Sequence, residues 1–366
     1  MKVICDRGAL LDALNLAGGV VLARTPKSAL KCVHLKAEDD RLALAATDAE
    51  VSVRLASARV EVEEPGEALI PSDKLASIVR ESIDPTLTLQ TDGDVAEIVG
   101  QDSHFKVFGQ PVADFPTLPA FTGDPDFECD AAELHKLIAL TLFATARENS
   151  RYAINGVLVE RTGNKLALVA TDGHRLALAK GSCRRGSDET KSCIVPTKAL
   201  TLLQKLFDDA EQTVKVQLRE NQILFATDDA TLASNLVEGA FPPYKDVIPK
   251  DGDKKAIVNT DMLISAVRRA ALLTNEESKG VRMSFSENGL VMSSRAPEMG
   301  EAEVRVDLTE FTGEAIDIGF NPTYVLDALK VVGEDQVTLE LKAGNKPGVL
   351  KTGPDFLYVV MPVNLQ

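Results

Sequence analysis

The sequence repeats itself at a constant interval. Residues 42–48 (LALAATD) return as residues 166–172 (LALVATD), and a weaker third copy aligns at residues 290–294 (LVMSS). Residue 166 lies 124 positions after residue 42, and residue 290 lies 124 positions after residue 166. Self-similarity at a fixed period predicts similar structural units placed in series.

Two further markers keep nearly the same interval. An apolar stretch ending in proline at residues 69–71 (LIP) recurs at residues 194–196 (IVP), and residues 318–322 (IGFNP) stand in the third position. A bulky apolar residue followed by proline closes each unit, at Phe115-Pro116, Phe241-Pro242 and Met361-Pro362. Three sets of markers in one register argue against a chance repeat.

The repeat also sets the expected domain organisation. A chain of 366 residues is too long for one compact core, because domains usually hold about 100 to 200 residues. Residues 116–125 and 249–255 have the Pro, Gly and Asp content of linkers. We therefore predict three domains, over residues 1–122, 123–250 and 251–366.

Each unit combines strand-like runs of alternating apolar residues with two amphipathic helices, which predicts an α+β fold. Asp92-Gly93 and residues 287–289 (ENG) have the composition of hairpin turns between strands. The predicted helices cover residues 7–17, 72–82, 131–147, 197–207, 260–273 and 323–330.

Charge is distributed unevenly between these helices and the rest of the chain. The formal net charge is −15, which argues against a protein that grips nucleic acid with its whole surface. The six predicted helices nevertheless hold ten basic and six acidic residues, a balance of +4, so the remainder carries −19. Such a polarised molecule can present a positive helical face to DNA, although amphipathic helices often expose Lys and Arg for solubility alone.

Composition excludes several classes of protein. A hydrophobic content of 45% and a mean hydropathy of −0.02 are typical of a soluble globular protein, and no run reaches the roughly 18 apolar residues of a membrane span. The five cysteines are an odd number without a C-x-x-C pair, which favours a reducing cytoplasm over a disulfide framework. We expect no metal and no cofactor.

The sequence offers no catalytic constellation. Only four histidines occur, and His174 lacks an accompanying nucleophile elbow, metal motif or phosphate loop. Acidic pairs such as Asp39-Asp40 fall in turn-like sequence and are expected to be solvated. We predict that the chain is not an enzyme. Two alternatives remain open: a nuclease-like enzyme with clustered acids and divalent metal, and a scaffold that never holds DNA.

Self-association would close the open sheet edges of such a series, and twofold dimers are the commonest closed form. If the helices line a ring, six leave a hole of only about 10 Å, whereas the twelve helices of two chains leave about 28 Å. The larger hole admits a duplex.

Several motifs, in order along the whole chain, resemble the bacterial sliding clamp, the beta subunit of DNA polymerase III holoenzyme. The most specific are residues 151–156 (RYAING), 170–176 (ATDGHRL), 194–196 (IVP), 319–326 (GFNPTYVL) and 358–362 (YVVMP). The resemblance implies the DNA clamp fold: three repeated domains, each with two helices packed on antiparallel sheets, forming half of a ring. It further implies a cytoplasmic homodimer that encircles duplex DNA. Its protein partners would be the polymerase III catalytic subunit, the clamp loader, other polymerases and repair proteins, which bind through short linear motifs.

The resemblance also implies DNA-facing positions, to which we add Lys74 and Lys205 from the predicted helices. Scattered, sequence-independent contacts to phosphates permit sliding. Glu148 lies near a position that contacts DNA in some relatives, where a carboxylate repels phosphate. The positions carried over from the family are Arg24, Tyr152 and Lys198.

An apolar cleft between the second and third domains is implied as the docking site for partner peptides. Aliphatic walls, with His174 and Arg175 expected at the rim, suit one or two leucine or phenylalanine anchors. Burying about 100 Å² of such a side chain contributes on the order of 2.5 kcal/mol, which suits exchangeable partners. The cleft positions are Ile154, Thr171, Gly173, His174, Arg175, Leu176, Pro242, Val247, Asn321, Tyr324, Val359, Val360, Met361, Pro362 and Val363.

The chain departs from the family near this cleft. Asp246 stands where many relatives have a basic residue, and Ser278 where some have an aromatic one. The chain also ends one residue beyond the usual terminal leucine, at Gln366. We therefore expect somewhat different peptide preferences.

For the dimer interface, the resemblance implies that Phe105 and Val107 of one subunit meet Leu272 and Leu273 of the other. Lys74 is expected to face an acidic residue across the interface, and apolar pairs ringed by opposite charges form a joint that a loader can open. The candidate acids are Glu298, Glu301 and Glu303.

Overall fold

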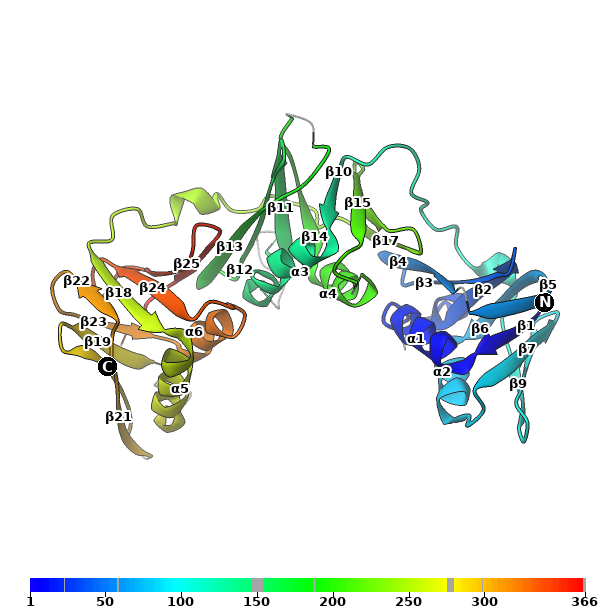
Figure 1. The fold of residues 1–366 in the computed structure, drawn as a ribbon, viewed down its shortest axis with the longest axis horizontal. Coiled ribbons are helices and arrows are strands. Elements are labelled where there is room, and N and C mark those ends of the chain that lie inside the picture. The colour runs from blue at the N-terminus through cyan, green and yellow to red at the C-terminus, as the bar shows by residue number, and fades with distance from the viewer. Residues whose placement is uncertain are drawn as a thin grey trace. The chain divides into compact units, whose positions relative to one another are not determined.

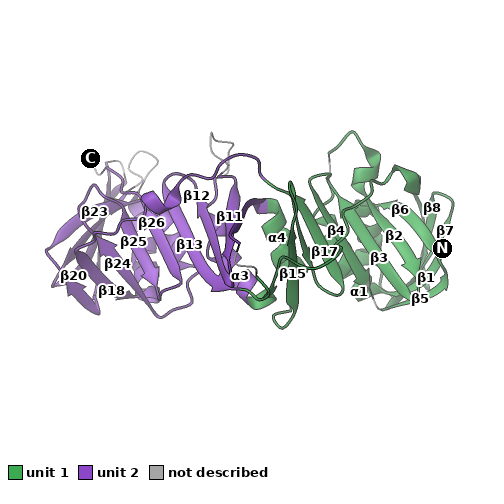
Figure 2. Ribbon diagram, turned by 90° about the horizontal axis from the view of Figure 1, so that it is seen from above, with its two compact units in different colours: residues 1–132, 183–187, 198–236 green, residues 133–182, 188–197, 237–366 purple. Residues whose placement is uncertain are grey.

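The computed structural model describes residues 1–22, 24–57, 59–146, 154–186, 189–207, 209–274, 280–297 and 299–364. These residues form six α-helices and a set of antiparallel sheets, labelled in Figure 1. Contacts divide the chain into two compact units, coloured in Figure 2. Unit 1 holds residues 1–132, 183–187 and 198–236, and unit 2 holds residues 133–182, 188–197 and 237–366.

Unit 1 contains two antiparallel sheets, a five-stranded one in the order β5-β1-β7-β8-β9 and an eight-stranded one in the order β10-β15-β16-β17-β4-β3-β2-β6. The strands are β1 (Lys2–Asp6), β2 (Cys32–Glu38), β3 (Arg41–Thr47), β4 (Val51–Ser57), β5 (Val60–Glu64), β6 (Gly66–Pro71), β7 (Thr86–Asp92), β8 (Val95–Val99), β9 (His104–Phe108), β10 (Phe127–Asp130), β15 (Thr213–Leu218), β16 (Gln222–Ala226) and β17 (Ala230–Asn235). The helices are α1 (Arg7–Gly18), α2 (Ser72–Glu81) and α4 (Thr197–Leu206), with short 3-10 turns η1 (Ser28–Lys31) and η2 (Val112–Asp114). Thr197, the first residue of α4, is grouped with unit 2.

The helices of unit 1 form because their apolar residues recur on one face. Leu10 and Leu14 of α1 and Leu75 and Val79 of α2 are almost completely buried, and the two helices pack on each other and on the strands. Asp6 caps α1, since its Oδ1 accepts a hydrogen bond of 2.8 Å from Ala9 N.

Unit 2 contains a nine-stranded antiparallel sheet in the order β14-β11-β12-β13-β26-β25-β24-β18-β22 and a four-stranded one in the order β21-β20-β19-β23. The strands are β11 (Gly156–Thr162), β12 (Lys165–Thr171), β13 (Arg175–Ser182), β14 (Lys191–Pro196), β18 (Lys254–Asn259), β19 (Val281–Ser286), β20 (Gly289–Ala296), β21 (Gly300–Val306), β22 (Glu310–Thr312), β23 (Ile316–Phe320), β24 (Gln336–Leu341), β25 (Gly348–Thr352) and β26 (Phe356–Val360). The helices are α3 (Ala131–Ala139), α5 (Thr260–Ala270) and α6 (Pro322–Leu329), with turns η3 (Leu142–Ala144), η4 (Tyr244–Asp246) and η5 (Ala271–Leu273). The first two residues of α3 are grouped with unit 1.

The predicted helix windows match the observed helices, with one clear correction. The helix predicted over residues 131–147 ends at Ala139, and a short 3-10 turn follows it. The buried Thr141 explains this end, because its hydroxyl donates to the carbonyls of Leu137 (2.8 Å) and Ile138 (3.4 Å) and satisfies the last turn. Arg147, counted in the predicted helical charge, lies outside the described residues.

The sequence repeat corresponds to a repeated turn. Thr47 Oγ1 donates to Val51 O at 2.9 Å, and Thr171 Oγ1 donates to Arg175 O at 2.6 Å. The residue two positions after each threonine, Ala49 or Gly173, has a positive φ of 79° or 89°. Two stretches 124 residues apart therefore fold in the same way.

The repeat also explains the composition of the large sheets. After the turns, β4 pairs with β17 in the eight-stranded sheet, and β13 pairs with β26 in the nine-stranded sheet. Each large sheet thus joins strands from two successive repeats. The predicted α+β fold, with two helices per repeat on antiparallel sheets, is confirmed.

Candidate functional site

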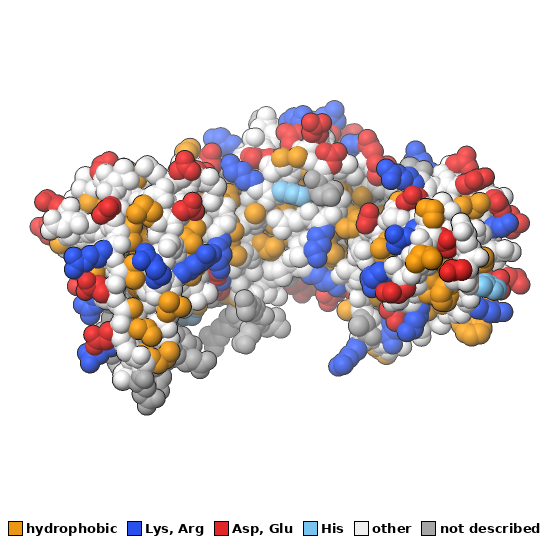
Figure 3. All heavy atoms as spheres, turned by 60° about the horizontal axis from the view of Figure 1, so that its bottom comes forward, with side chains coloured by type: hydrophobic (Ala, Val, Ile, Leu, Met, Phe, Trp, Pro, Cys, Tyr) orange, Lys and Arg blue, Asp and Glu red, His pale blue; other side chains and the backbone are white. Residues whose placement is uncertain are grey.

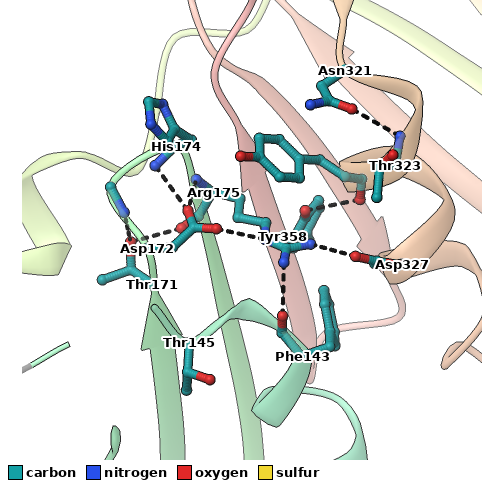
Figure 4. A network of polar contacts seen from close by, with 12 residues as sticks. Phe143, Thr145, Thr171, Asp172, His174, Arg175, Asn321, Thr323, Asp327 and Tyr358 are labelled. Carbon is teal, nitrogen blue, oxygen red and sulfur yellow. Dashed lines mark hydrogen bonds and ion pairs between the residues drawn. The ribbon is translucent and has the colours of Figure 1, made fainter. Parts of the chain in front are cut away.

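A buried arginine at the start of β13 organises one region of unit 2 (Figure 4). Its Nε donates to Asp172 Oδ2 at 2.9 Å, its Nη1 to Asp327 Oδ2 at 2.8 Å and its Nη2 to Phe143 O at 2.8 Å. The side chain of this residue, Arg175, is only 8% exposed. Burial by itself lowers the pKa of the guanidinium, but its contacts, foremost the hydrogen bond to Asp327, outweigh that effect and raise the pKa above its usual range.

Aromatic rings enclose the same guanidinium. Its carbon lies 4.6 Å from the ring centroid of Tyr324 and 5.5 Å from that of Phe143. The hydroxyl of Tyr358 donates to Tyr324 O at 2.9 Å, which ties β26 to α6. Arg175 thus connects the 171–175 turn and η3 of the second repeat to α6 of the third.

This burial corrects one expectation about the predicted cleft. Arg175 does not lie at a solvent-facing rim, because Asp172, Asp327 and two rings surround it. His174 is exposed, as expected, and stacks on Tyr324 with 6.3 Å between ring centroids. Arg175 therefore stabilises the structure beside the cleft positions, and His174 is the polar side chain that a ligand could reach.

An apolar cluster lies on the nine-stranded sheet next to this network, at strands β11 to β14 and β26 and along residues 237–248. Its buried members are Leu158, Val169, Leu176, Leu178, Ile194, Tyr244 and Val359, and partly buried members are Ala167, Val237, Phe241, Ile248 and Leu357. Tyr244 holds the 237–248 segment against the sheet, because its hydroxyl donates to Glu160 Oε2 at 2.5 Å. Burial, together with the contact to the Glu160 carboxylate, raises the pKa of Tyr244.

The structure brings most predicted cleft positions together within unit 2. Arg175 pairs with Val360 and Leu176 with Val359 across β13 and β26, and Met361 N donates to His174 O at 2.9 Å. Asn321 caps α6 by accepting from Thr323 N at 2.9 Å, and Tyr324 follows it (Figure 4).

The other cleft positions fall into four groups. Thr171 and Gly173 form the turn that precedes β13, and Val363 N bonds to Gly319 O at 2.9 Å. Ile154 is buried and its carbonyl accepts from Ala146 N. The partly or fully exposed positions are Pro242, Val247, Met361 and Pro362, of which Val247 is 57% and Met361 44% exposed.

Sequence reasoning missed five residues that hold this region in place: Phe143, Glu160, Tyr244, Asp327 and Tyr358. Nothing local in the sequence relates them, since their contacts span between 32 and 152 positions. Asp172 was detectable, because the repeat places it in register with Asp48.

Three of the predicted DNA-facing residues, Arg24, Lys74 and Lys205, are exposed. The side chain of Lys74 is 68% exposed and 3.5 Å from Asp73, and Tyr152 lies outside the described residues. Figure 3 shows basic and acidic side chains interspersed on the visible face, without one continuous basic surface.

Lys198 differs from Lys74 because its acidic partner is buried, whereas Asp73 beside Lys74 is 73% exposed. Its Nζ contacts Asp48 Oδ2 and donates to Val20 O at 3.2 Å, all within unit 1. The side chain of Asp48 is 6% exposed. Burial raises the pKa of that carboxyl, but the lysine and the backbone amides of Val51 and Glu50 outweigh it and lower the pKa overall.

The predicted dimer positions lie on exposed edges of the sheets and on η5. Phe105 is 39% and Leu272 72% exposed, while Leu273 is partly buried. Val107 is 9% exposed and faces the core of unit 1, so its side chain adds little apolar surface, contrary to expectation. The exposed large apolar residues that the sequence did not single out are Ile83, Val99, Phe108, Met262 and Met299.

The acids proposed to face Lys74 have partners of their own. Glu301 Oε1 lies 3.1 Å from Arg295 Nε, and Glu303 Oε1 lies 3.0 Å from Arg305 Nη2. Glu298 lies outside the described residues.

The described residues contain no group of three or more His, Cys, Asp or Glu side chains placed to hold a metal ion. In the same part of the chain, no helix has the length and apolar character needed to cross a membrane.

Comparisons with known proteins cover the whole chain. Residues 1–119, 128–243 and 245–364 match the N-terminal, central and C-terminal domains of the DNA polymerase III beta subunit. The beta sliding clamps of Pseudomonas putida and Escherichia coli K12 are 35% and 34% identical, with 100% of each chain covered. Among solved structures, a Pseudomonas aeruginosa sliding clamp bound to griselimycin has a TM-score of 0.95 at 34% identity, and a Bacillus subtilis clamp has 0.94 at 26%, again with 100% of both chains covered.

These matches define the class as sliding clamps, which are non-catalytic processivity factors of DNA replication. The chain belongs to the family of DNA polymerase III beta subunits, and the resemblance predicted from its motifs is confirmed.

Proposed function

We propose that this protein is a DNA sliding clamp: a homodimeric ring that encircles duplex DNA and tethers the replicative polymerase. The supporting observation is the match of all three repeats, in order and over the full length, to the three domains of the beta subunit family. The clamp works by topology, so it needs no catalytic residues of its own and acts in the cytoplasm beside the replication machinery. Its three domains would cover residues 1–122, 123–250 and 251–366.

Partners would dock on the apolar cluster of unit 2. Two features support this site: the cluster is flanked by the exposed apolar side chains of Val247 and Met361, and His174 offers an accessible polar group beside them. The Arg175 network and the Tyr244–Glu160 hydrogen bond hold the surrounding segments in place. A preorganised apolar surface of this kind binds short peptides with little ordering cost. The ligands would be linear motifs of the polymerase, the clamp loader and repair proteins.

The DNA contacts would come from exposed cations such as Arg24, Lys74 and Lys205. Because Asp48 neutralises Lys198, that lysine would contribute less to phosphate binding than the other three. Weak and scattered contacts leave the ring free to slide.

The dimer would form between β9 of one subunit and the η5 and β21 region of the other. In support, both β9 and β21 are edge strands, whose outer backbone groups have no neighbour within their own sheets. Phe105, Leu272 and the nearby Phe108 supply apolar surface.

Retention on DNA tests the function. The protein is loaded on nicked circular plasmid with a clamp loader, and the plasmid is then linearised. A topological clamp stays on the circle and is lost from the linear form. Equal retention on both forms would contradict a clamp, and no retention on the circle would favour a scaffold that never holds DNA.

A further inference from the structure

Two buried cysteines lie next to a short antiparallel bridge of unit 1, one on each of its two segments. Glu128 N donates to Arg184 O at 2.9 Å, and Arg184 N donates to Glu128 O at 2.6 Å, so these residues form a hydrogen-bonded pair. Antiparallel partners keep a constant sum of residue numbers. The adjacent pair is therefore Cys129 on β10 and Cys183 just after β13.

The spacing of this pair suits a disulfide. A pair next to a hydrogen-bonded one is non-hydrogen-bonded, and its Cα atoms lie about 4.5 Å apart. Disulfides join Cα atoms roughly 4.4 to 6.8 Å apart. Directly opposed residues also place their side chains on the same face of the ladder. Both side chains are buried there, with Cys129 1% and Cys183 5% exposed.

Ion pairs on both sides hold the two segments in register. Arg184 pairs with Asp130, and Arg185 Nη1 lies 3.1 Å from Glu128 Oε1. On its other side β10 is paired with β15, where Cys129 faces Val214. Backbone and side-chain contacts together therefore hold the two segments beside Cys129 and Cys183.

We propose that Cys129 and Cys183 are a site of reversible thiol oxidation, at which a low-molecular-weight disulfide converts the two thiols into one intramolecular disulfide. One cysteine, as thiolate, attacks the small disulfide and forms a mixed disulfide, which releases the first small thiol. The second cysteine then attacks the protein sulfur of that mixed disulfide and releases the second small thiol. The protein loses two hydrogens and two electrons, and the small disulfide is reduced to two thiols.

In a reducing compartment the pair rests as two thiols, which is their state in the structure. Oxidation would link β10 to the start of the β13–β14 connection. The proposal stands independently of the DNA clamp function.

The remaining three cysteines are matched controls. The ladder partners of Cys5 are Val60 and Leu87, that of Cys32 is Pro71, and that of Cys193 is Val159, so none of the three opposes another cysteine.

Refolding in a glutathione redox buffer tests the site. The reduced full-length chain is unfolded in guanidinium and refolded at increasing ratios of oxidised to reduced glutathione, so that burial cannot hide the thiols from the reagent. Thiols are then counted after denaturation, and disulfides are mapped by mass spectrometry without reduction. We expect the count to fall from five to three, with one Cys129–Cys183 link, and dithiothreitol to restore all five.

Variants separate this site from general oxidation. Cys5→Ser and Cys193→Ser should still lose two thiols, whereas Cys129→Ser and Cys183→Ser should lose none to an intramolecular bond. Circular dichroism checks that each variant has refolded. A wild-type chain that keeps all five thiols in the most oxidising buffer, or that forms its disulfide between other cysteines, would overturn the proposal.

Discussion

Asp48 and Asp172 occupy the same position in two copies of the repeat and perform the same two tasks. Each Oδ1 accepts from two backbone amides of its own turn, Glu50 and Val51 for Asp48, and His174 and Arg175 for Asp172. Each Oδ2 holds a cation, Lys198 in the first case and Arg175 in the second. Each of these cations also joins its turn to the following repeat, Lys198 from α4 and Arg175 by reaching Asp327 on α6. The repeated Thr-Asp motif therefore connects successive repeats.

Removing Asp327, the carboxylate partner of Arg175 on α6, should destabilise unit 2. Asp327→Ala leaves a buried guanidinium without one of its two carboxylates, and such a loss costs about 3 kcal/mol. Denaturant unfolding followed by circular dichroism measures the effect. Lys330→Ala is the matched control on the same helix, because Lys330 is 52% exposed and its surface contact with Asp327 contributes less than about 1 kcal/mol. Equal losses in the two variants would contradict the role assigned to Arg175.

The sequence predicted much of the fold because the relevant signals are local. Apolar residues at helical spacing predicted all six helices, and the repeat predicted similar structural units placed in series. The predicted end of α3 was wrong because a single buried hydroxyl, that of Thr141, determines where the helix ends. The apolar pattern of the sequence continues through Thr141, so it predicts a helix that extends past this residue.

The site was harder to predict because its contacts are distant in sequence. Arg175 was expected at the rim, yet its partners Phe143 and Asp327 lie 32 and 152 positions away. Lys198 was expected to face DNA, and nothing in the sequence indicated that Asp48, 150 positions away, pairs with it. Whether a cation is exposed depends on which acidic residue the fold brings near it. Neither the spacing of residues in the sequence nor the composition predicts that neighbour.

Acid should weaken the contact between Asp48 and Lys198. The pKa of Asp48 is lower in the folded chain than the ordinary aspartate value of 3.8, so folding favours the carboxylate. The associated stability is fully present above pH 3.8 and is lost as the pH falls through the lower folded pKa. The melting temperature of Asp48→Asn should therefore lie well below that of wild type at pH 7, and the gap should narrow below pH 3.8. Glu50→Gln, at an exposed neighbouring position, is the control and should show no such narrowing. A gap that stays constant down to pH 2 would contradict the ion pair.

A charge on the apolar cluster should abolish partner binding without unfolding the chain. Val247→Asp or Met361→Asp places a carboxylate where an apolar anchor would be buried, and desolvating it should weaken binding of a leucine- and phenylalanine-containing peptide at least about tenfold. Fluorescence anisotropy of a labelled peptide measures the affinity. Met262→Asp, on the exposed face of α5, alters a comparably exposed methionine outside the cluster and should bind normally. Unchanged affinity in both cluster variants would place the docking site elsewhere.

Charges on η5 should separate the dimer. Leu272 is 72% exposed in the isolated subunit, which is costly unless a partner covers it, and Leu273 lies beside it. Leu272→Asp with Leu273→Asp would bury two unpaired carboxylates in the interface, so sedimentation equilibrium should report a single subunit of about 39 kDa instead of twice that mass. Phe108→Asp tests the opposite edge, because its side chain is 72% exposed on β9 and should give the same result. Met262→Asp again serves as control and should remain dimeric. A double variant at η5 that sediments as a dimer while Phe108→Asp is monomeric would keep β9 in the interface and remove η5 from it.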